Sequence, residues 1–214
     1  VCGRFGASLH DACLDALPRA EGLRCDRCWR PGVRGTCERC ASGGPDAPAF
    51  RALRTPFRFE GPARRALLEA KFRWITAHLE PLGRAAAAVV PEDWHVEAVV
   101  AVPLGHRRRR MRGFNQAHEV GRAVAGVLGV PLVDGLVERT RETAPQAMLD
   151  ADSRHRNLRG AFCVTAPPPE RVLVVDDVTT TGSTLSEVAA ALQTVSTAVG
   201  NTPNVYTLAI ARED

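Results

Sequence analysis

The most constraining feature of the sequence is an apolar run that ends in two adjacent acids and a hydroxyl-rich loop. The run Val172 to Val175 is aliphatic, and Asp176 and Asp177 follow it directly. This composition is typical of a buried strand in a parallel sheet. Ligands of open α/β sheets bind beyond the carboxyl ends of such strands. A ligand site is therefore predicted here, with further candidate residues at Thr179, Thr180, Thr181, Gly182, Ser183 and Thr184.

The chemistry of this site follows from its residue types. The loop precedes a helix expected at 184–195, so its free N–H groups and the helix dipole favour a phosphate. Gly182 lets the backbone approach the phosphate closely. Two carboxylates would repel a phosphate in the same cradle, but they suit hydrogen bonds from a ribose 2′,3′-diol beside it. The alternative is a capped helix in which the threonines serve only as caps.

Strands and helices alternate along the rest of the chain. Extended segments are expected at 50–59, 96–102, 132–137, 162–165, 172–175 and 205–211, and helices at 9–17, 61–72, 79–90, 116–128 and 184–195. This order predicts an α/β fold in which a mostly parallel sheet is flanked by helices on both faces. Residues 41–48 have the composition of a linker, which predicts an N-terminal module at 1–48 and a main domain at 49–214.

An arginine-rich loop is expected at 104–114, after the strand at 96–102. Pro103 and Leu104 begin it, Arg107 to Arg110 form a basic run, and Arg112 opens the string Arg-Gly-Phe-Asn-Gln. Such a loop can neutralise a diphosphate, and Arg112 is the preferred candidate for that contact. A solvated basic loop and a nucleic-acid patch are the alternatives.

Seven cysteines occur, and four of them have the spacing of a metal site. Cys25 and Cys28 form one C-x-x-C pair, Cys37 and Cys40 form another, and eight residues separate the pairs. Four thiolates suit a structural Zn²⁺, whereas two redox pairs or free thiols are the alternative. Cys2 and Cys13 have no assigned role, and Cys163 is expected in the core. The arginines around the pairs are candidates for nucleic-acid contact: Arg24, Arg27, Arg30, Arg34 and Arg39.

One further segment and the aromatic content of the chain also bear on the site. The polar stretch 138–159 has the length of a functional lid, with a surface excursion as the alternative. Aromatic residues make up only 5% of the chain, and Trp29, Trp74 and Trp94 are isolated in the sequence. This composition argues against a platform for stacking bases.

Several strings together resemble the ComF family, whose members are competence-associated homologues of type I phosphoribosyltransferases. They are Pro103-Leu104, 112–116, Thr143 with Gln146, 154–157 and 176–182. The resemblance implies a type I phosphoribosyltransferase-like fold that binds phosphoribosyl pyrophosphate (PRPP) with Mg²⁺. It implies that Asp176 and Asp177 hold the ribose diol, that 179–184 holds the 5′-phosphate, and that 138–159 closes as a hood. Asp176, Asp177 and Arg112 are the candidate catalytic residues.

Two functions are expected from this resemblance. One is transfer of a ribose phosphate to an unidentified acceptor, with pyrophosphate leaving. The other is a non-catalytic role in DNA uptake during natural transformation, in which the fold binds single-stranded DNA beside a helicase-like competence protein. No apolar run of membrane-spanning length and no secretory signal is recognised, so a cytoplasmic protein without membrane insertion is expected.

Overall fold

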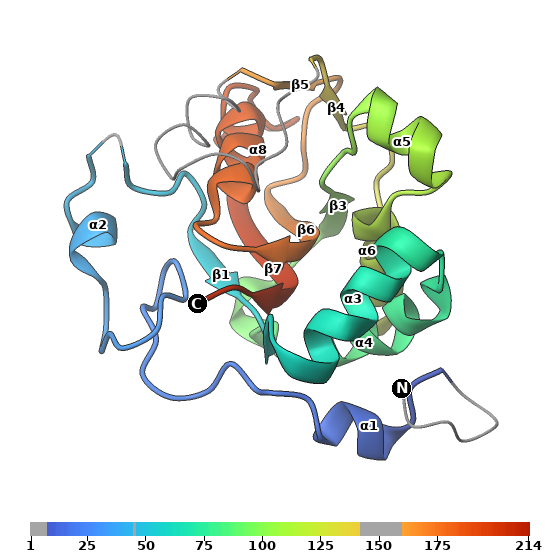
Figure 1. The fold of residues 1–214 in the computed structure, drawn as a ribbon. Coiled ribbons are helices and arrows are strands. Elements are labelled where there is room, and N and C mark those ends of the chain that lie inside the picture. Colours follow the sequence, from blue (N-terminus) through green and yellow to red (C-terminus); the bar gives the residue numbers. More distant parts are fainter. Residues whose placement is uncertain (1–7, 45, 142–159) are drawn as a thin grey trace.

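The computed structural model describes residues 8–44, 46–141 and 160–214. Its main sheet runs in the order β1-β7-β6-β3, and β2 pairs with the end of β7. All of these pairs are parallel. The strands are β1 (Ala52–Arg54), β2 (Phe57–Arg58), β3 (Ala98–Ala101), β6 (Arg171–Thr179) and β7 (Asn204–Arg212). The predicted parallel α/β sheet is confirmed (Figure 1).

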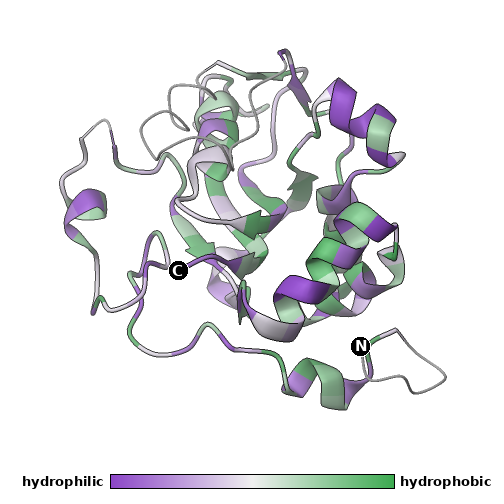
Figure 2. Cartoon of the chain, in the orientation of Figure 1, coloured by the Kyte–Doolittle hydropathy of each residue, from purple (hydrophilic) through white to green (hydrophobic). Residues whose placement is uncertain are grey.

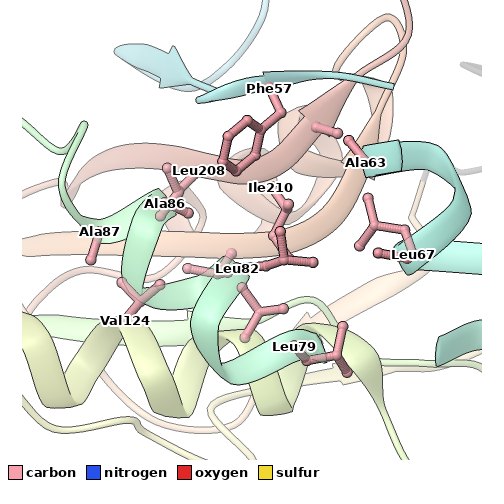
Figure 3. Packing of buried hydrophobic residues seen from close by; sticks show 14 of the residues in the cluster. Phe57, Ala63, Leu67, Leu79, Leu82, Ala86, Ala87, Val124, Leu208 and Ile210 are labelled. Carbon is pink, nitrogen blue, oxygen red and sulfur yellow. The ribbon is translucent and has the colours of Figure 1, made fainter. Parts of the chain in front are cut away.

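Helices cover both faces of the sheet. One face packs against α3 (Gly61–Arg73), α4 (Leu79–Ala87) and α6 (Gln116–Leu128), where Leu208 and Ile210 of β7 meet Leu82 of α4 (Figure 3). The other face packs against α8 (Ser183–Gln193) and a small antiparallel ribbon of β4 (Val137–Arg139) and β5 (Phe162–Val164). Strand β6 shows the alternation that produces these two cores, because Leu173 lies in the first and Val174 in the second.

Three expected elements differ in the structure. The stretch expected as a loop at 104–114 contains a helix, α5 (His106–Arg112). No residue of α5 is buried, so the helix carries no apolar period that could have predicted it (Figure 2). Strand β6 is longer than 172–175, because pairing with β7 continues to Thr179. The strand expected at 132–137 is reduced to an isolated parallel bridge at Leu132, followed by β4.

The N-terminal segment lies against the sheet domain. Helix α1 (Asp11–Asp15) carries Cys13 into the main core, together with Leu9 and Leu17. Short 3-10 helices occur at η1 (Thr76–His78) and η2 (Glu92–Trp94), and α2 (Glu38–Ala41) lies in the cysteine-rich segment. None of the helices in the described ranges is long and apolar enough to cross a membrane.

Two of the tryptophans that look isolated in the sequence join one stack of side chains. The Arg54 guanidinium lies 4.4 Å from the ring centroid of Trp29 and 5.3 Å from that of Trp94. Trp94 in turn stacks on Tyr206 of β7, with the ring centroids 4.5 Å apart. The stack therefore connects the cysteine-rich segment to the sheet through β1.

Candidate ribose-phosphate site and cysteine cluster

The two adjacent acids lie inside the end of β6 and have different surroundings. Successive side chains of a strand point to opposite faces. Asp177 therefore continues the face that carries Leu173 and Val175 and faces α3. Asp177 is buried, whereas Asp176 is half-buried. The two carboxyl groups still interact, because the charge of Asp177 and a side-chain hydrogen bond with it both act on the pKa of Asp176.

Asp177 forms an ion pair with Lys71, the only lysine of the chain. Lys71 lies near the end of α3, and its Nζ is 2.7 Å from Asp177 Oδ2. The backbone N–H of Val178 donates to Asp177 Oδ1 at 2.9 Å. Sequence analysis did not select Lys71. The sequence did offer a signal for it, since Lys71 is the single lysine among 28 lysine and arginine residues. An ammonium is a more compact charge than a guanidinium, so a lysine fits a small pocket that an arginine would not.

Asp176 has an unusual protonation equilibrium. Burial and the nearby negative charge of Asp177 raise its pKa to about 7, although Lys71 acts in the opposite direction. The N–H of Asp177 donates to Asp176 Oδ1 at 2.8 Å and also favours the ionised form. A carboxyl group with this pKa accepts hydrogen bonds from hydroxyl groups more strongly as the pH rises through neutrality.

The hydroxyl-rich loop after β6 leads into α8, as expected. Gly182 is the N-cap of α8 and has φ 79°, a left-handed conformation that side chains disfavour. A Cβ at this position would lie 3.4 Å from the Phe50 ring. The Thr181 and Ser183 hydroxyls are 2.6 Å apart, and the N–H of Glu213 donates to the Thr179 carbonyl. The loop is therefore held in a compact turn at the start of a helix.

The second predicted loop begins at the neighbouring strand. The N–H of Val102 donates to the Val175 carbonyl at 2.9 Å, so Pro103 follows β3 at the same edge at which Asp176 follows Val175. Pro103 and Leu104 line a cavity of about 620 Å³ together with His106 and Arg109 of α5. The structure thus brings the two predicted loops to adjacent carboxyl ends of one parallel sheet.

Arg112 ends α5 on the side of the acids. Its Nη1 donates to Gln116 Oε1 at 3.1 Å, and its guanidinium lies 5.6 Å from the Phe72 ring centroid. Burial lowers the pKa of Arg112, and the negative charge of Asp177 opposes that change. The side chain therefore remains a cation close to Asp177.

The four cysteines of the two pairs form one buried cluster. The sulfurs of Cys25, Cys28, Cys37 and Cys40 all lie within 4.8 Å of one another. Zn–S bonds of about 2.3 Å place sulfurs about 3.8 Å apart around a tetrahedral ion. The Cys28 and Cys37 sulfurs are 3.6 Å apart, which fits this requirement.

The protonation of the cluster also suits a metal. Burial opposes ionisation of Cys25, but hydrogen bonds from the backbone of Cys28, Cys37 and Arg27 outweigh it and lower the pKa of Cys25 to about 6. Burial and the neighbouring thiols raise the pKa of Cys40. One thiolate therefore forms readily, whereas four thiolates packed together need a compensating cation.

Three of the arginines around the cysteines bind the protein itself. Arg24 is 8% exposed and pairs with Asp214 at 2.9 Å. Arg27 donates to the Phe50 carbonyl, and Arg39 donates to the Thr181 carbonyl at 3.2 Å. The first two are therefore structural, and Arg39 links the cysteine segment to the hydroxyl-rich loop. Two of the five candidates for nucleic-acid contact, Arg30 and Arg34, are exposed.

Some predicted residues lie outside the described ranges. They are Cys2 and most of the expected hood, including Thr143, Gln146, Arg154, Arg156 and Asn157.

Comparison with known proteins identifies relatives along most of the chain. The sequence is 31% identical to the DNA utilization protein YhgH of Escherichia coli over 81% of this chain and 79% of that protein. It is 40% identical to competence protein F of Haemophilus influenzae, in an alignment that spans 45% of this chain and only 44% of that protein. It is 25% identical to competence protein ComFC of Bacillus subtilis over 85% of this chain and 76% of that protein. No protein-family model matches the sequence.

Proposed function

The chain belongs to the family of competence protein F, ComFC and YhgH, and on this premise we propose that it binds PRPP or a related ribose phosphate. The observation that carries the proposal is the meeting of two loops at adjacent carboxyl ends of the sheet. One loop follows Asp176 and the other follows Val102, and the N–H of Val102 is bonded to Val175. Ligand sites of open α/β sheets occupy this position.

In this proposal the acids and the loop divide the ligand between them. Asp176 and Asp177 accept hydrogen bonds from the ribose hydroxyls, and Lys71 neutralises Asp177 so that both carboxylates can lie near a phosphorylated ligand. The 5′-phosphate lies at the start of α8, where backbone N–H groups and the hydroxyls of 179–184 donate to it. Gly182 suits this position because its φ of 79° disfavours a side chain, and a Cβ there would contact the Phe50 ring at 3.4 Å.

The pyrophosphate group lies at the second loop. The backbone at Pro103 and Leu104 faces it, and Arg112 neutralises part of its charge. Mg²⁺ bound with PRPP would neutralise more of that charge and stabilise the leaving group. For the transfer reaction, an acceptor nucleophile forms a bond to C1 of the ribose while the C1–oxygen bond to pyrophosphate breaks. Positioning and charge stabilisation would supply most of the rate, so no covalent nucleophile of the protein is needed.

A second function is favoured by the exposed arginines of α5. Arg109 and Arg110 are exposed on this short helix, beside the cavity that contains Pro103. A basic helix next to a phosphate site can bind the backbone of single-stranded DNA without any ribosyl transfer. The names of the relatives, which refer to competence and DNA utilization, agree with such a role for those proteins.

The four cysteines would hold a structural zinc in either function. The segment around them has no hydrophobic core of its own beyond the sulfur cluster and Val33. Zinc would order this segment, and Arg39 would then hold the carbonyl of Thr181 in the phosphate loop.

The proposal is tested by calorimetric titration of PRPP with Mg²⁺ into the wild type and an Asp176→Asn, Asp177→Asn double variant. We expect binding by the wild type and a loss of about 100-fold or more in the variant, because charge-assisted hydrogen bonds to the diol are removed. A Glu92→Gln, Asp93→Asn double variant removes two charges at another site and should bind normally.

The two candidate functions give different results in a companion titration. Wild-type protein that binds no PRPP but binds single-stranded DNA with a steep salt dependence would refute PRPP binding and support the DNA-binding function. Binding of PRPP that DNA competes away would place both ligands at one site. Pyrophosphate release on adding a nucleobase would identify an enzyme.

A further inference from the structure

Two large aromatic side chains are exposed at the carboxyl end of α3. Phe72 is 68% exposed and Trp74 is 66% exposed. Single exposed apolar residues are ordinary, but two aromatic rings at one helix end indicate a binding surface. The low aromatic content of the sequence argues against a stacking platform, yet Trp74 and Phe114 line one cavity and Phe72 lies beside Arg112 of that cavity.

The backbone of Trp74 gives a second reason to look for a function. Trp74 has φ 57°, a left-handed conformation, and its N–H caps α3 by donating to the Glu69 carbonyl. Glycine ordinarily occupies such a cap, since a bulky side chain is strained there. Burial does not explain a tryptophan at this position, because most of its side chain faces solvent.

A cavity with polar groups adjoins these rings. It is a shallow depression that is open to solvent and has a volume of about 550 Å³. Trp74 and Phe114 supply its aromatic walls, while Arg112, Thr76 and Glu119 supply polar groups. The Arg112 guanidinium also lies 5.6 Å from the Phe72 ring centroid. Flat aromatic and guanidinium surfaces with a carboxylate beside them match a planar heterocycle that carries N–H groups.

The cavity lies near the acid pair, and this position indicates the class of heterocycle that it binds. Phe72 follows Lys71, which forms an ion pair with Asp177. Arg112 is also near Asp177, whose negative charge acts on the pKa of Arg112. We propose that the surface formed by Phe72, Trp74 and Arg112 stacks a nucleobase whose ribose phosphate lies at the acid pair. The location of the ribose rests on the proposed function, whereas the stacking surface stands on its own contacts.

Glu119 sets an expected preference among bases. Its Oε2 accepts from Arg122 at 3.0 Å, and its Oε1 lies 3.6 Å from His118 Nδ1. A carboxylate at the edge of the cavity can accept a hydrogen bond from an exocyclic amine, as carboxylates do with cytosine. Adenine and cytosine should therefore bind more tightly than uracil, which has no exocyclic amine.

The test compares ligands with and without a base. Calorimetry would measure AMP, UMP and ribose 5-phosphate against the wild type, Trp74→Leu, Trp74→Phe and Glu119→Gln. We expect AMP to bind roughly tenfold more tightly than ribose 5-phosphate, and Trp74→Leu to remove that advantage. Trp74→Phe should keep most of it, and Glu119→Gln should reduce the preference for AMP over UMP. Val199→Ala, which alters another exposed apolar side chain, should change nothing.

The base could belong to a DNA strand or to a free nucleotide, and a parallel titration of a single-stranded oligodeoxynucleotide distinguishes the two. A larger loss for the oligonucleotide than for AMP in Trp74→Leu would identify a DNA strand as the ligand, and the reverse would identify a free nucleotide. Both results support the stacking surface. Equal binding of AMP and ribose 5-phosphate, with oligonucleotide binding unchanged in Trp74→Leu, would overturn it.

A PRPP titration of the same proteins separates the two proposals. Trp74→Leu should bind PRPP as the wild type does, because PRPP has no base. Nucleotide or oligonucleotide binding that depends on Trp74 in a protein that does not bind PRPP would uphold the stacking surface and refute the proposed ribose site. Thermal denaturation of each variant would verify that it is folded.

Discussion

The cysteine cluster and the candidate ribose-phosphate site are assembled in different ways. All four cysteine sulfurs come from one short segment, and they form a compact buried group. The ribose-phosphate site instead takes Asp177 from β6, Lys71 from α3, Arg112 from α5 and Pro103 from the loop after β3. The first arrangement is encoded by local spacing, whereas the second exists only when the sheet and its helices are packed.

The two regions are nevertheless in contact. Arg39 of the cysteine segment donates to Thr181, and Phe50, whose carbonyl accepts from Arg27, packs against Gly182. Arg212 of β7 also donates to the Cys28 carbonyl at 2.9 Å. A metal that orders the local region would therefore also support the loop of the distant site, and this coupling can be measured.

Loss of the metal should give the largest effect. Replacing Cys40 by Ser should abolish stoichiometric zinc and destabilise the protein by several kcal/mol, because the ligand set becomes incomplete. Elemental analysis and urea denaturation would measure these changes. Cys163→Ser, outside the cluster, should retain zinc. A Cys40→Ser protein with unchanged zinc content would contradict the four-cysteine site.

Removal of Lys71 should have the next largest effect. Lys71→Met leaves Asp177 buried without its cation, so we expect a loss of about 2 kcal/mol in the free energy of unfolding. PRPP affinity should also fall by roughly tenfold. Lys71→Arg retains the charge and should recover much of both. If Lys71→Met matched the wild type in urea denaturation and calorimetry, Lys71 would have no role in the site.

The hydroxyl-rich loop can be tested through Gly182. Gly182→Ala should destabilise the protein by about 1–2 kcal/mol, because its φ is 79° and the new Cβ meets Phe50. Gly129→Ala is a matched control with φ 68° and no atom within 4 Å of its Cβ. PRPP affinity should weaken more in Gly182→Ala than in Gly129→Ala. Equal affinities in the two variants would exclude a special role for the Phe50 contact.

The affinity for PRPP should depend on pH through Asp176. Its pKa is raised to about 7, so its ionised fraction rises about tenfold between pH 6 and pH 8. The ionised carboxylate is the better acceptor, and affinity should rise by up to about tenfold over this interval. Calorimetry at several pH values would measure the change. The Asp176→Asn variant measures how much of the pH dependence of PRPP affinity comes from the phosphates of the ligand. If affinity rose with pH as steeply in that variant as in the wild type, Asp176 would not be the group that titrates.

The link between the regions should give the smallest effect. Arg39→Met removes one hydrogen bond to the Thr181 carbonyl, so we expect PRPP affinity to fall by about threefold with zinc content unchanged. Arg34→Met alters an exposed arginine of the same segment and is the control. Equal affinities in the two variants would show that the cysteine segment does not influence the hydroxyl-rich loop.

Much of the fold could be predicted because its apolar pattern is strong. The run Val172 to Val175 and the helix over 116–128 have clear apolar patterns; the run lies within the longer strand β6, and the helix has the predicted bounds. Helix α5 was predicted as a loop because its arginines leave no buried face. Trp74 looked isolated in the sequence because its position beside Arg112 depends on how α3 packs near α5. No local sequence pattern predicts that packing.

The sequence by itself determined the features that depend on neighbouring residues. These are the apolar strand that delivers Asp176 and Asp177, the hydroxyl-rich turn at Gly182, and the paired cysteines. Only the tertiary structure decided that Lys71 pairs with Asp177 and that Arg39 contacts the loop. Local spacing sets strand, turn and ligand geometry, whereas a contact between residues far apart in the chain arises from how the helices pack on the sheet.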